Sequence, residues 1–422
     1  MAMHSNTIAL ATKSVDAEIA FDGYPYLRTY KDGRIERLAV STFVPASDEP
    51  GATGVATRDV VIDLGTGVSV RLFLNVAAAA TGSRLPIIVY FHGGAFCTGS
   101  AFSKLFHRYA ASLSTRAGAL VVSVDYRLVP EHPILAAYDD AWEALQWVAS
   151  LSDPWLANHA DPMRMFLAGE SAGANIVHNV ASRAMAPDGD DIDINGLILL
   201  QPFFWGTERL PAEMDWSNGP VFAPERLDTL WSFLTAGVAD NDDPRLNPQA
   251  DEVARLPCRR ALVSVATKDV MGDRGRRYAA LLRHGEWCRE VTLVESEGED
   301  HAFHLVRPRR ATAVALMDRV VEFVNASAAP PISNPKAEHL PMREGTNGTC
   351  RAMMTSGSGK KVCGLPRTMA RNALVVGPAK TPAASFVLLG LTSSSKLVHK
   401  GLFTRGVGVQ RRIVAKSFPL LA

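Results

Sequence analysis

The pentapeptide Gly-Glu-Ser-Ala-Gly at residues 169–173 has the residue types and spacing of a turn that presents a nucleophilic serine. A serine hydroxyl is a poor nucleophile at neutral pH, so it needs a base to take its proton and donors to hold the oxyanion that forms. The flanking glycines permit the crowded bend that exposes Ser171 at a fixed angle. The N–H of Ala172, at the start of the helix expected next, should point toward that oxyanion. The pattern therefore predicts attack by Ser171 on a carbonyl carbon.

A second glycine motif, His-Gly-Gly-Ala at residues 92–95, directly follows the apolar run Leu85–Phe91. Consecutive glycines let backbone N–H groups approach a ligand closely, so Gly93 and Gly94 are candidate donors to the same oxyanion. Either motif alone could be an ordinary glycine turn. The two together, each after a predicted strand, favour one catalytic site.

The base and the acid that orients it should follow the nucleophile in the order acid, then histidine. Asp269 comes just after the strand predicted at Ala261–Ala266, and the carboxyl end of a strand is where such sheets place functional residues. Asp273 fits the first turn of the next helix instead, as a cap or a partner of the helix dipole. For the base, His301 and His304 both lie in the loop after the last predicted strand, and spacing alone leaves both open.

Two charged segments near these candidates have simpler interpretations. Glu299 and Asp300 precede the candidate bases, and we expect their side chains to be solvated. Their carboxylates could also raise the pKa of a neighbouring imidazole. The segment 125–133 follows another strand and carries charges and prolines. We interpret it as an ion-paired, proline-stiffened loop that supports the floor of the site.

Short apolar runs alternate with helix-spaced segments through most of the chain, which is typical of βαβ crossovers and a mostly parallel sheet. The predicted strands are Arg58–Asp63, Val68–Asn75, Leu85–Phe91, Ala119–Asp125, Met163–Ala168, Ile194–Leu200, Ala261–Ala266 and Val291–Val294. The predicted helices are Ala101–Ala117, Asp139–Leu151, Ala172–Met185, Arg274–His284 and Thr312–Val324. The first two strands are predicted to form a hairpin.

The chain divides into three parts by pattern. Residues 1–50 are irregular apart from an amphipathic piece at Ile19–Tyr30, and residues 51–325 carry the alternation. An aromatic excursion at about 205–237 interrupts it, where a lid or substrate-pocket segment would lie. Residues 326–422 hold 14 basic and two acidic residues without periodicity, which predicts a disordered tail; a basic interaction tail and a misassigned gene end are the alternatives.

Composition excludes several classes of protein. The net charge of +1 shows no bias toward nucleic acid, and 47% hydrophobic residues suffice for one large core. Five scattered cysteines without a C-x-x-C pair argue against a disulfide framework or a zinc site. The first 20 residues lack a signal-peptide pattern, and no apolar run reaches the length of a membrane helix. We therefore expect a cytoplasmic protein without membrane attachment. The sequence does not indicate its oligomeric state.

Several motifs together resemble, in order and spacing, the plant carboxylesterases of the hormone-sensitive-lipase group in the α/β-hydrolase superfamily. The matching segments are His92–Phe96, Asp125–Leu128, Gly169–Gly173 and Glu299–His304, with Tyr30–Arg37 and Gln201–Gly206 as further stretches. The resemblance covers about residues 15–325. It departs at Ala95 and Ala174, which are commonly glycine in the family, and it has no counterpart for the tail.

The resemblance implies an α/β-hydrolase fold with lids from the N-terminus and from the mid-chain excursion. It implies a catalytic triad of Ser171, Asp269 and His301, which favours His301 over His304. It also implies oxyanion donors at Gly93, Gly94 and Ala172. Small or aromatic esters would be the substrates, and neither a metal nor an organic cofactor would be needed.

Two relatives of this group suggest other functions. Isoflavanone dehydratases use a very similar site to eliminate water, and the sequence leaves that activity open. Gibberellin receptors share the fold and the serine turn but lose the catalytic histidine. Because His301 is present here, the sequence favours an enzyme over a receptor.

Overall fold

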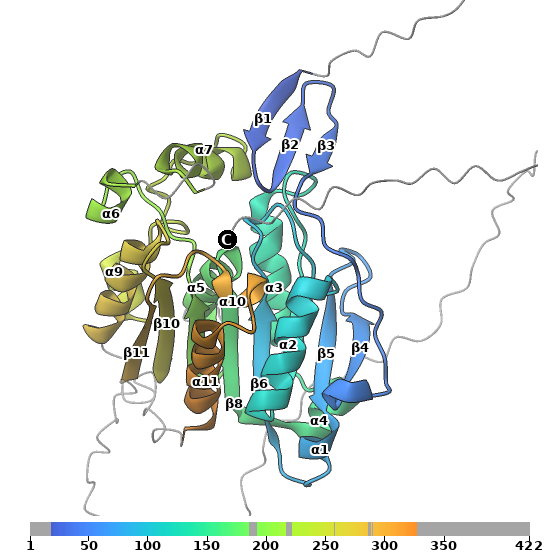
Figure 1. Cartoon of the computed structure of the whole chain (residues 1–422). Coiled ribbons are helices and arrows are strands. Elements are labelled where there is room, and N and C mark those ends of the chain that lie inside the picture. The colour runs from blue at the N-terminus through green and yellow to red at the C-terminus, as the bar shows by residue number, and fades with distance from the viewer. Residues whose placement is uncertain are drawn as a thin grey trace, which may run out of the picture. The chain divides into compact units, whose positions relative to one another are not determined.

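The structure is a computed structural model that describes residues 18–184, 192–216, 222–256, 258–285, 288 and 290–326. Residues 1–17 and the predicted tail from residue 327 onward lie outside this range. The main element is an eight-stranded sheet in the order β11-β10-β9-β8-β6-β7-β5-β4 (Figure 1). Its strands are β4 (Val55–Val61), β5 (Ser69–Asn75), β6 (Leu85–Phe91), β7 (Leu120–Asp125), β8 (Ala160–Glu170), β9 (Gly196–Leu200), β10 (Arg260–Ala266) and β11 (Glu290–Ser296).

The predicted mostly parallel sheet is confirmed. Strands β6 to β11 run parallel to one another, whereas β5 is antiparallel to both β7 and β4. The β4–β5 pair is the predicted hairpin. All seven residues of β6 and of β10 are buried, as expected for strands that helices cover on both faces.

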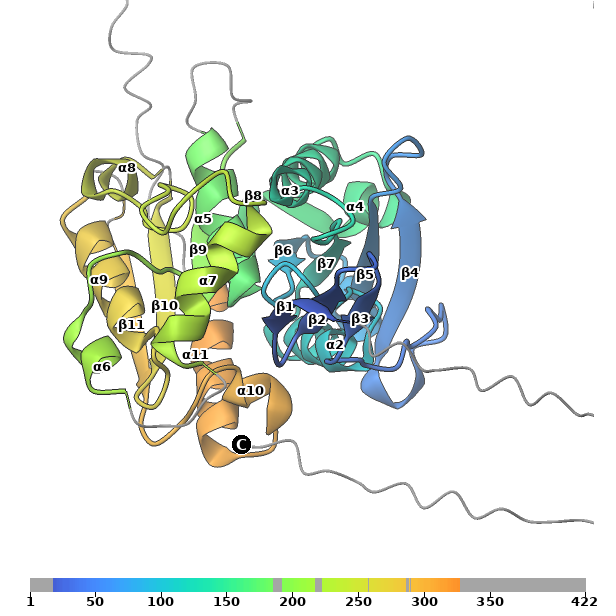
Figure 2. The ribbon, with the colours of Figure 1, turned by 90° about the horizontal axis from the view of Figure 1, so that it is seen from above.

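Helices form a layer on each face of the sheet, as the view from above shows (Figure 2). Helices α2 and α11 pack with each other on one face, and α3, α5 and α9 supply apolar side chains to the core on the other. The helices are α1 (Val76–Ala79), α2 (Lys104–Ala117), α3 (Ile134–Ala149), α4 (Pro154–His159), α5 (Ala172–Ala184), α6 (Pro211–Met214), α7 (Pro224–Leu234), α8 (Ala250–Ala254), α9 (Gly272–Arg283), α10 (Phe303–Val306) and α11 (Ala311–Asn325), with a 3₁₀ turn at Gly51–Thr53. None of the helices in the described ranges has both the length and the apolarity to cross a membrane.

The N-terminal segment differs from the irregular structure that its sequence predicts. It forms a three-stranded antiparallel sheet of β1 (Ile19–Gly23), β2 (Leu27–Tyr30) and β3 (Ile35–Arg37). These strands have three to five residues, and only Leu27 among them is buried, so no clear alternation of apolar and polar residues marks them.

Two separate parts of the chain meet at the end of the main sheet where the active-site candidates lie. The small sheet β1–β3 and helix α7 lie side by side there in both views (Figures 1 and 2). The rings of Phe21 and Phe233 stack with their centroids 4.0 Å apart, which joins the two. Glu213 in α6 and Arg274 in α9 form a fully buried ion pair at 2.6 Å that anchors the mid-chain excursion.

Candidate active site

Ser171 occupies the turn between β8 and α5. Its φ of 54° is a left-handed conformation that non-glycine residues rarely adopt, and such strain is typical of functional turns. The turn stays sharp because its glycines have no side chain: a Cβ on Gly173 would lie 2.0 Å from the carbonyl oxygen of Phe91, and one on Gly169 would lie 2.4 Å from the backbone of Gly173. The Ser171 N–H donates to the carbonyl oxygen of Leu200 on β9 at 3.0 Å.

The structure brings the predicted serine, histidine and aspartate into one hydrogen-bonded chain. The His301 Nε2 atom lies 2.9 Å from the Ser171 hydroxyl, and its Nδ1 atom lies 2.7 Å from Oδ2 of Asp269. The side chains of His301 and Asp269 are 3% and 1% exposed, so bulk water does not separate them. The other carboxylate oxygen of Asp269 accepts the N–H of Met271 at 3.1 Å, which fixes its orientation.

The electrostatic surroundings favour a proton on the imidazole of His301. Burial is the largest single effect and lowers the pKa of His301, but the adjacent Asp269 carboxylate, together with Asp300 and Glu170, raises that pKa above its ordinary value. An imidazole held in this way accepts a proton more readily than a free histidine, which is the property a general base needs.

The two competing candidates lie elsewhere. Asp273 is in the first turn of α9, where it binds Arg276 at 2.8 Å and accepts the N–H of Ala212, so it acts as a helix-terminal partner. His304 lies in α10, buried, with its ring 5.3 Å from that of Tyr109 in a perpendicular contact. No hydrogen bond of the described residues joins either side chain to Ser171.

The three predicted oxyanion donors differ from one another in the structure. Gly94 has a φ of 111°, and a Cβ there would lie 2.1 Å from the carbonyl oxygen of Thr98, so glycine is required. Within the described part of the chain, no acceptor is bonded to the N–H groups of Gly94 and Ala172. The N–H of Gly93, in contrast, donates to Oε1 of Glu170. Gly93 is therefore not free to donate in this arrangement, which differs from the expectation of three available donors.

Glu170, the residue before the nucleophile, was not singled out by the sequence. Its carboxyl group is buried between the Gly93 N–H and the hydroxyl of Tyr90, which donates to Oε2. Burial raises the pKa of Glu170 to about 8. An acidic side chain inside the Gly-x-Ser-x-Gly motif, directly before the serine, was the signal that could have identified it.

The loop that carries His301 is fixed by side chains predicted to be solvated. Glu299 is 4% exposed because its carboxylate binds Arg310 at 2.7 Å and the Thr312 hydroxyl at 2.6 Å. The expectation of a solvated Glu299 is therefore wrong. Asp300 is partly buried, and its Oδ1 accepts the His301 N–H at 2.7 Å.

Gln201 at the end of β9 also positions this loop. Its side-chain oxygen accepts the N–H of Ala302, the residue after His301, at 2.7 Å. Gln201 has a φ of 48° and is 1% exposed, so both its backbone and its side chain are held in place. Apart from its place in a recurring stretch, Gln201 has no sequence feature that predicts this role.

The charged loop after β7 supports the glycine motif, in agreement with its structural interpretation. The Tyr126 hydroxyl donates to the carbonyl oxygen of His92 at 2.7 Å. Arg127 forms an ion pair with the buried Asp140 at 2.6 Å. Arg37 of β3 binds both carboxylate oxygens of Glu131 at 2.7 Å, which ties the N-terminal sheet to this loop.

Residues of the N-terminal segment and of the mid-chain excursion border the site as well. The ring of Phe222, just before α7, lies 4.9 Å from the imidazole of His301, and Tyr26 of the N-terminal segment is partly buried near Asp269. In the described ranges, no group of histidine, cysteine, aspartate or glutamate side chains is arranged to hold a metal ion. The arrangement can therefore supply a nucleophile, a base and backbone donors from protein groups.

Comparison with known proteins places the chain in a family. The family described as the alpha/beta hydrolase fold matches residues 88–305, which include all three residues of the hydrogen-bonded chain. The chain belongs to the α/β-hydrolase family. Its curated relatives place it in the plant carboxylesterase group of hormone-sensitive-lipase type within that family.

Three curated relatives illustrate the range of this group. The 2-hydroxyisoflavanone dehydratase of Glycyrrhiza echinata is 39% identical over 340 residues, which cover 76% of this chain and 100% of the relative. Tuliposide A-converting enzyme 1, chloroplastic, of Tulipa gesneriana is 40% identical over 328 residues, or 76% and 82% of the two chains. Probable carboxylesterase 2 of Arabidopsis thaliana is 34% identical over 316 residues, or 74% and 98%.

Solved structures agree with the fold. The esterase of Pyrobaculum calidifontis is 27% identical, with a TM-score of 0.54, and the match covers 64% of this chain and 84% of that chain. The esterase LipW of Mycobacterium marinum is 28% identical with the same TM-score, over 65% and 83% of the two chains.

Replacing Asp269 by asparagine should lower the pKa of His301 by about one to two pH units, because the anion that stabilises the imidazolium is lost. NMR titration of the His301 ring protons measures this directly. Asp273→Asn is the matched control and should leave the His301 pKa within about 0.3 of a pH unit. An equal pKa in wild type and Asp269→Asn would contradict the assignment of Asp269 as the orienting acid.

Proposed function

We propose that this chain is a carboxylesterase that hydrolyses small or aromatic carboxylic esters through an acyl-enzyme on Ser171. The observation that carries the proposal is the buried chain from Asp269 through His301 to the Ser171 hydroxyl, with distances of 2.7 and 2.9 Å. Curated carboxylesterases and a solved esterase among its relatives support the same reaction class.

In the proposed reaction, His301 takes the proton from Ser171 while the serine oxygen attacks the ester carbonyl carbon. Asp269 keeps the Nδ1 proton on its side of the ring and stabilises the imidazolium that forms. His301 then gives the proton to the departing alcohol. Water repeats the sequence on the acyl-enzyme and releases the carboxylic acid.

The oxyanion of the tetrahedral intermediate would be bound by the N–H groups of Gly94 and Ala172. Donors that are already in position stabilise a developing charge more than water does, because they need no reorganisation. Gly93 would become a third donor only if its bond to Glu170 is released. A protonated Glu170 is a weaker acceptor than its carboxylate, so the two protonation states should differ in how firmly they hold this N–H.

The aromatic side chains around the site support this substrate class. Aromatic side chains from two separate segments lie at the site: Phe222 contacts His301, and the stacked Phe21 and Phe233 join the segments above it. Such surfaces favour small esters with an apolar or aromatic part.

Ser171→Ala should lower kcat for p-nitrophenyl acetate and p-nitrophenyl butyrate by at least about 10⁴-fold, because the attacking oxygen is absent. Spectrophotometric release of p-nitrophenol measures the rate. Ser182→Ala, which removes a hydroxyl from the same helix α5 at a distance from the turn, is the control and should keep wild-type activity. Equal rates in wild type and Ser171→Ala would exclude the proposed reaction.

Elimination of water from a 2-hydroxyisoflavanone is the second candidate, because the Glycyrrhiza echinata and Glycine max dehydratases are each 39% identical to this chain. Incubation with such a substrate and mass spectrometry of the product distinguish the two functions. We expect little or no loss of water compared with ester cleavage under the same conditions. Loss of water at a kcat/KM above that for the p-nitrophenyl esters would make the chain a dehydratase first.

A further inference from the structure

Glu170, the last residue of β8, lies in the protein interior directly beside the catalytic groups. It is 1% exposed, and its carboxyl group accepts the N–H of Gly93 with Oε1 and the hydroxyl of Tyr90 with Oε2. In the described part of the chain, no cation forms an ion pair with it. This carboxyl group therefore connects the turn that carries Ser171 with the glycine motif through uncharged partners.

Gly93 lies between the Glu170 carboxyl group and the nucleophile. A Cβ on Gly93 would be 2.8 Å from Oε1 of Glu170 and 3.2 Å from the Cβ of Ser171. The glycine backbone is thus in close contact with both side chains. Because the contact leaves no free space, the position of the carboxyl group determines where the backbone beside Ser171 lies.

The N–H of Gly94, a proposed oxyanion donor, belongs to a peptide unit that lies between two fixed neighbours. On one side, Glu170 holds the N–H of Gly93. On the other side, the carbonyl oxygen of Gly94 accepts the N–H groups of Cys97 and Thr98 at 2.9 and 3.0 Å. These bonds orient the peptide unit between Gly93 and Gly94, and a donor with a fixed direction is what an oxyanion site requires.

The surroundings of Glu170 favour its neutral form. Burial raises the pKa of Glu170 to about 8, because its hydrogen bonds offset burial only in part. The titratable groups that face it come from four elements or their following loops: Tyr90 of β6, Tyr109 of α2, Tyr126 after β7 and His301 after β11. Burial raises the pKa of all three tyrosines well above its ordinary value, so they remain uncharged.

We propose that Glu170 is a positioning residue of the oxyanion site, which acts through Gly93 on the peptide unit that carries the Gly94 N–H. At neutral pH it acts as an uncharged acid: Oε1 accepts the Gly93 N–H, and the acid proton is shared with the Tyr90 oxygen, which can both donate and accept. Ionised Glu170 puts a negative charge beside the oxyanion and opposes its formation. The inference rests on the proposed esterase reaction, because it concerns the oxyanion of that reaction.

The positioning role is tested by comparing Glu170→Ala with Glu170→Gln on p-nitrophenyl butyrate at pH 7. Alanine leaves the Gly93 N–H without its acceptor, so kcat should fall by about tenfold or more with KM within about threefold, because the oxyanion exists only beyond the ground state. Glutamine is neutral and keeps an oxygen for Gly93, so its kcat should stay within about threefold of wild type. Glu252→Gln, in α8, is the control and should keep the wild-type kcat.

The dependence of kcat on pH separates this role from a merely structural one. Wild-type kcat should rise as His301 loses its proton and then fall by about threefold or more above about pH 8, as Glu170 ionises. Glu170→Gln should remove the alkaline fall. Tyr90→Phe should move it upward by at least about 0.5 of a pH unit, because the Tyr90 hydroxyl favours the carboxylate.

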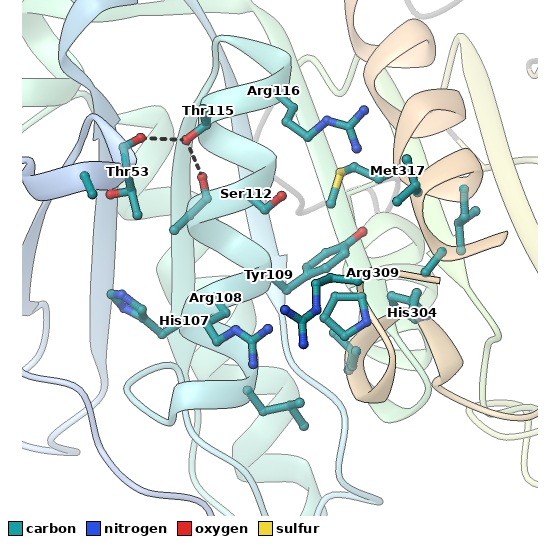
Figure 3. Close-up of a pocket in the computed structure, with 18 residues that line it drawn as sticks. Thr53, His107, Arg108, Tyr109, Ser112, Thr115, Arg116, His304, Arg309 and Met317 are labelled. Atoms are coloured by element: carbon teal, nitrogen blue, oxygen red, sulfur yellow. Dashed lines mark hydrogen bonds between the residues drawn. The ribbon is translucent and has the colours of Figure 1, made fainter. Parts of the chain in front are cut away.

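Tyr109→Phe is the matched control for Tyr90→Phe. The ring of Tyr109 lies 5.5 Å from that of Tyr90 and lines a separate cavity between α2 and α11 (Figure 3). Among the described residues, no hydrogen bond joins Tyr109 to Glu170. The alkaline fall of this variant should therefore stay at the wild-type pH.

Circular dichroism melting verifies that each variant is folded, and if Glu170→Ala does not fold, the pH profiles of Glu170→Gln and Tyr90→Phe decide. An unchanged kcat in folded Glu170→Ala, or an alkaline fall that persists in Glu170→Gln, would overturn the inference. A higher kcat in Glu170→Ala would also overturn it, because a released Gly93 would then be a third donor. In these cases wild-type turnover that depends on Ser171 still supports the proposed reaction. Absence of wild-type turnover contradicts the proposed reaction and the inference with it.

Discussion

The hydrogen bond between His301 and Ser171 is the interaction on which the rest of the site depends, because its two partners come from loops 130 residues apart. Ser171 follows β8, Asp269 follows β10 and His301 follows β11, and these strands lie close together on one side of the parallel sheet. Parallel strands bring their carboxyl ends to the same edge, so the sheet positions three side chains that no local contact could bring together. The helices and the buried apolar strands hold that edge rigid.

A second set of contacts fixes the orientation of these side chains. Glu299 is bonded to Arg310 and Thr312, and Gln201 holds the backbone next to the base, so the loop of His301 is tied to α11 on one side and to β9 on the other. Glu170 holds the backbone of the glycine motif in the same way, because it accepts the N–H of Gly93. Buried polar groups of this kind are costly unless they are bonded, and here each forms at least two hydrogen bonds. The site also depends on residues with a left-handed backbone conformation, such as Ser171 and Gln201.

The sequence predicted the elements with strong apolar patterns and missed those without them. The strand Leu85–Phe91 has the predicted bounds because all seven residues are buried, which gives a continuous apolar run. The strands β1–β3 were missed because they are short and mostly exposed, and α10 because it has four residues. Motifs and order predicted which serine, acid and histidine the structure would bring together, but spacing could not separate His301 from His304. That distinction depends on where each ring points. The burial of Glu299 likewise depends on the folded structure, because its two bonding partners are 11 and 13 residues away in the chain.

The most direct test of the central claim is to trap the covalent intermediate. Full-length protein mixed with p-nitrophenyl butyrate should be quenched in acid during turnover, digested and analysed by mass spectrometry. We predict a butyryl group on the peptide that contains Ser171, with an initial burst of p-nitrophenol of about one equivalent per chain if deacylation is the slower step. Ester turnover with the acyl group on another residue, or acylation of that peptide that persists in a Ser171→Ala chain, would contradict the account.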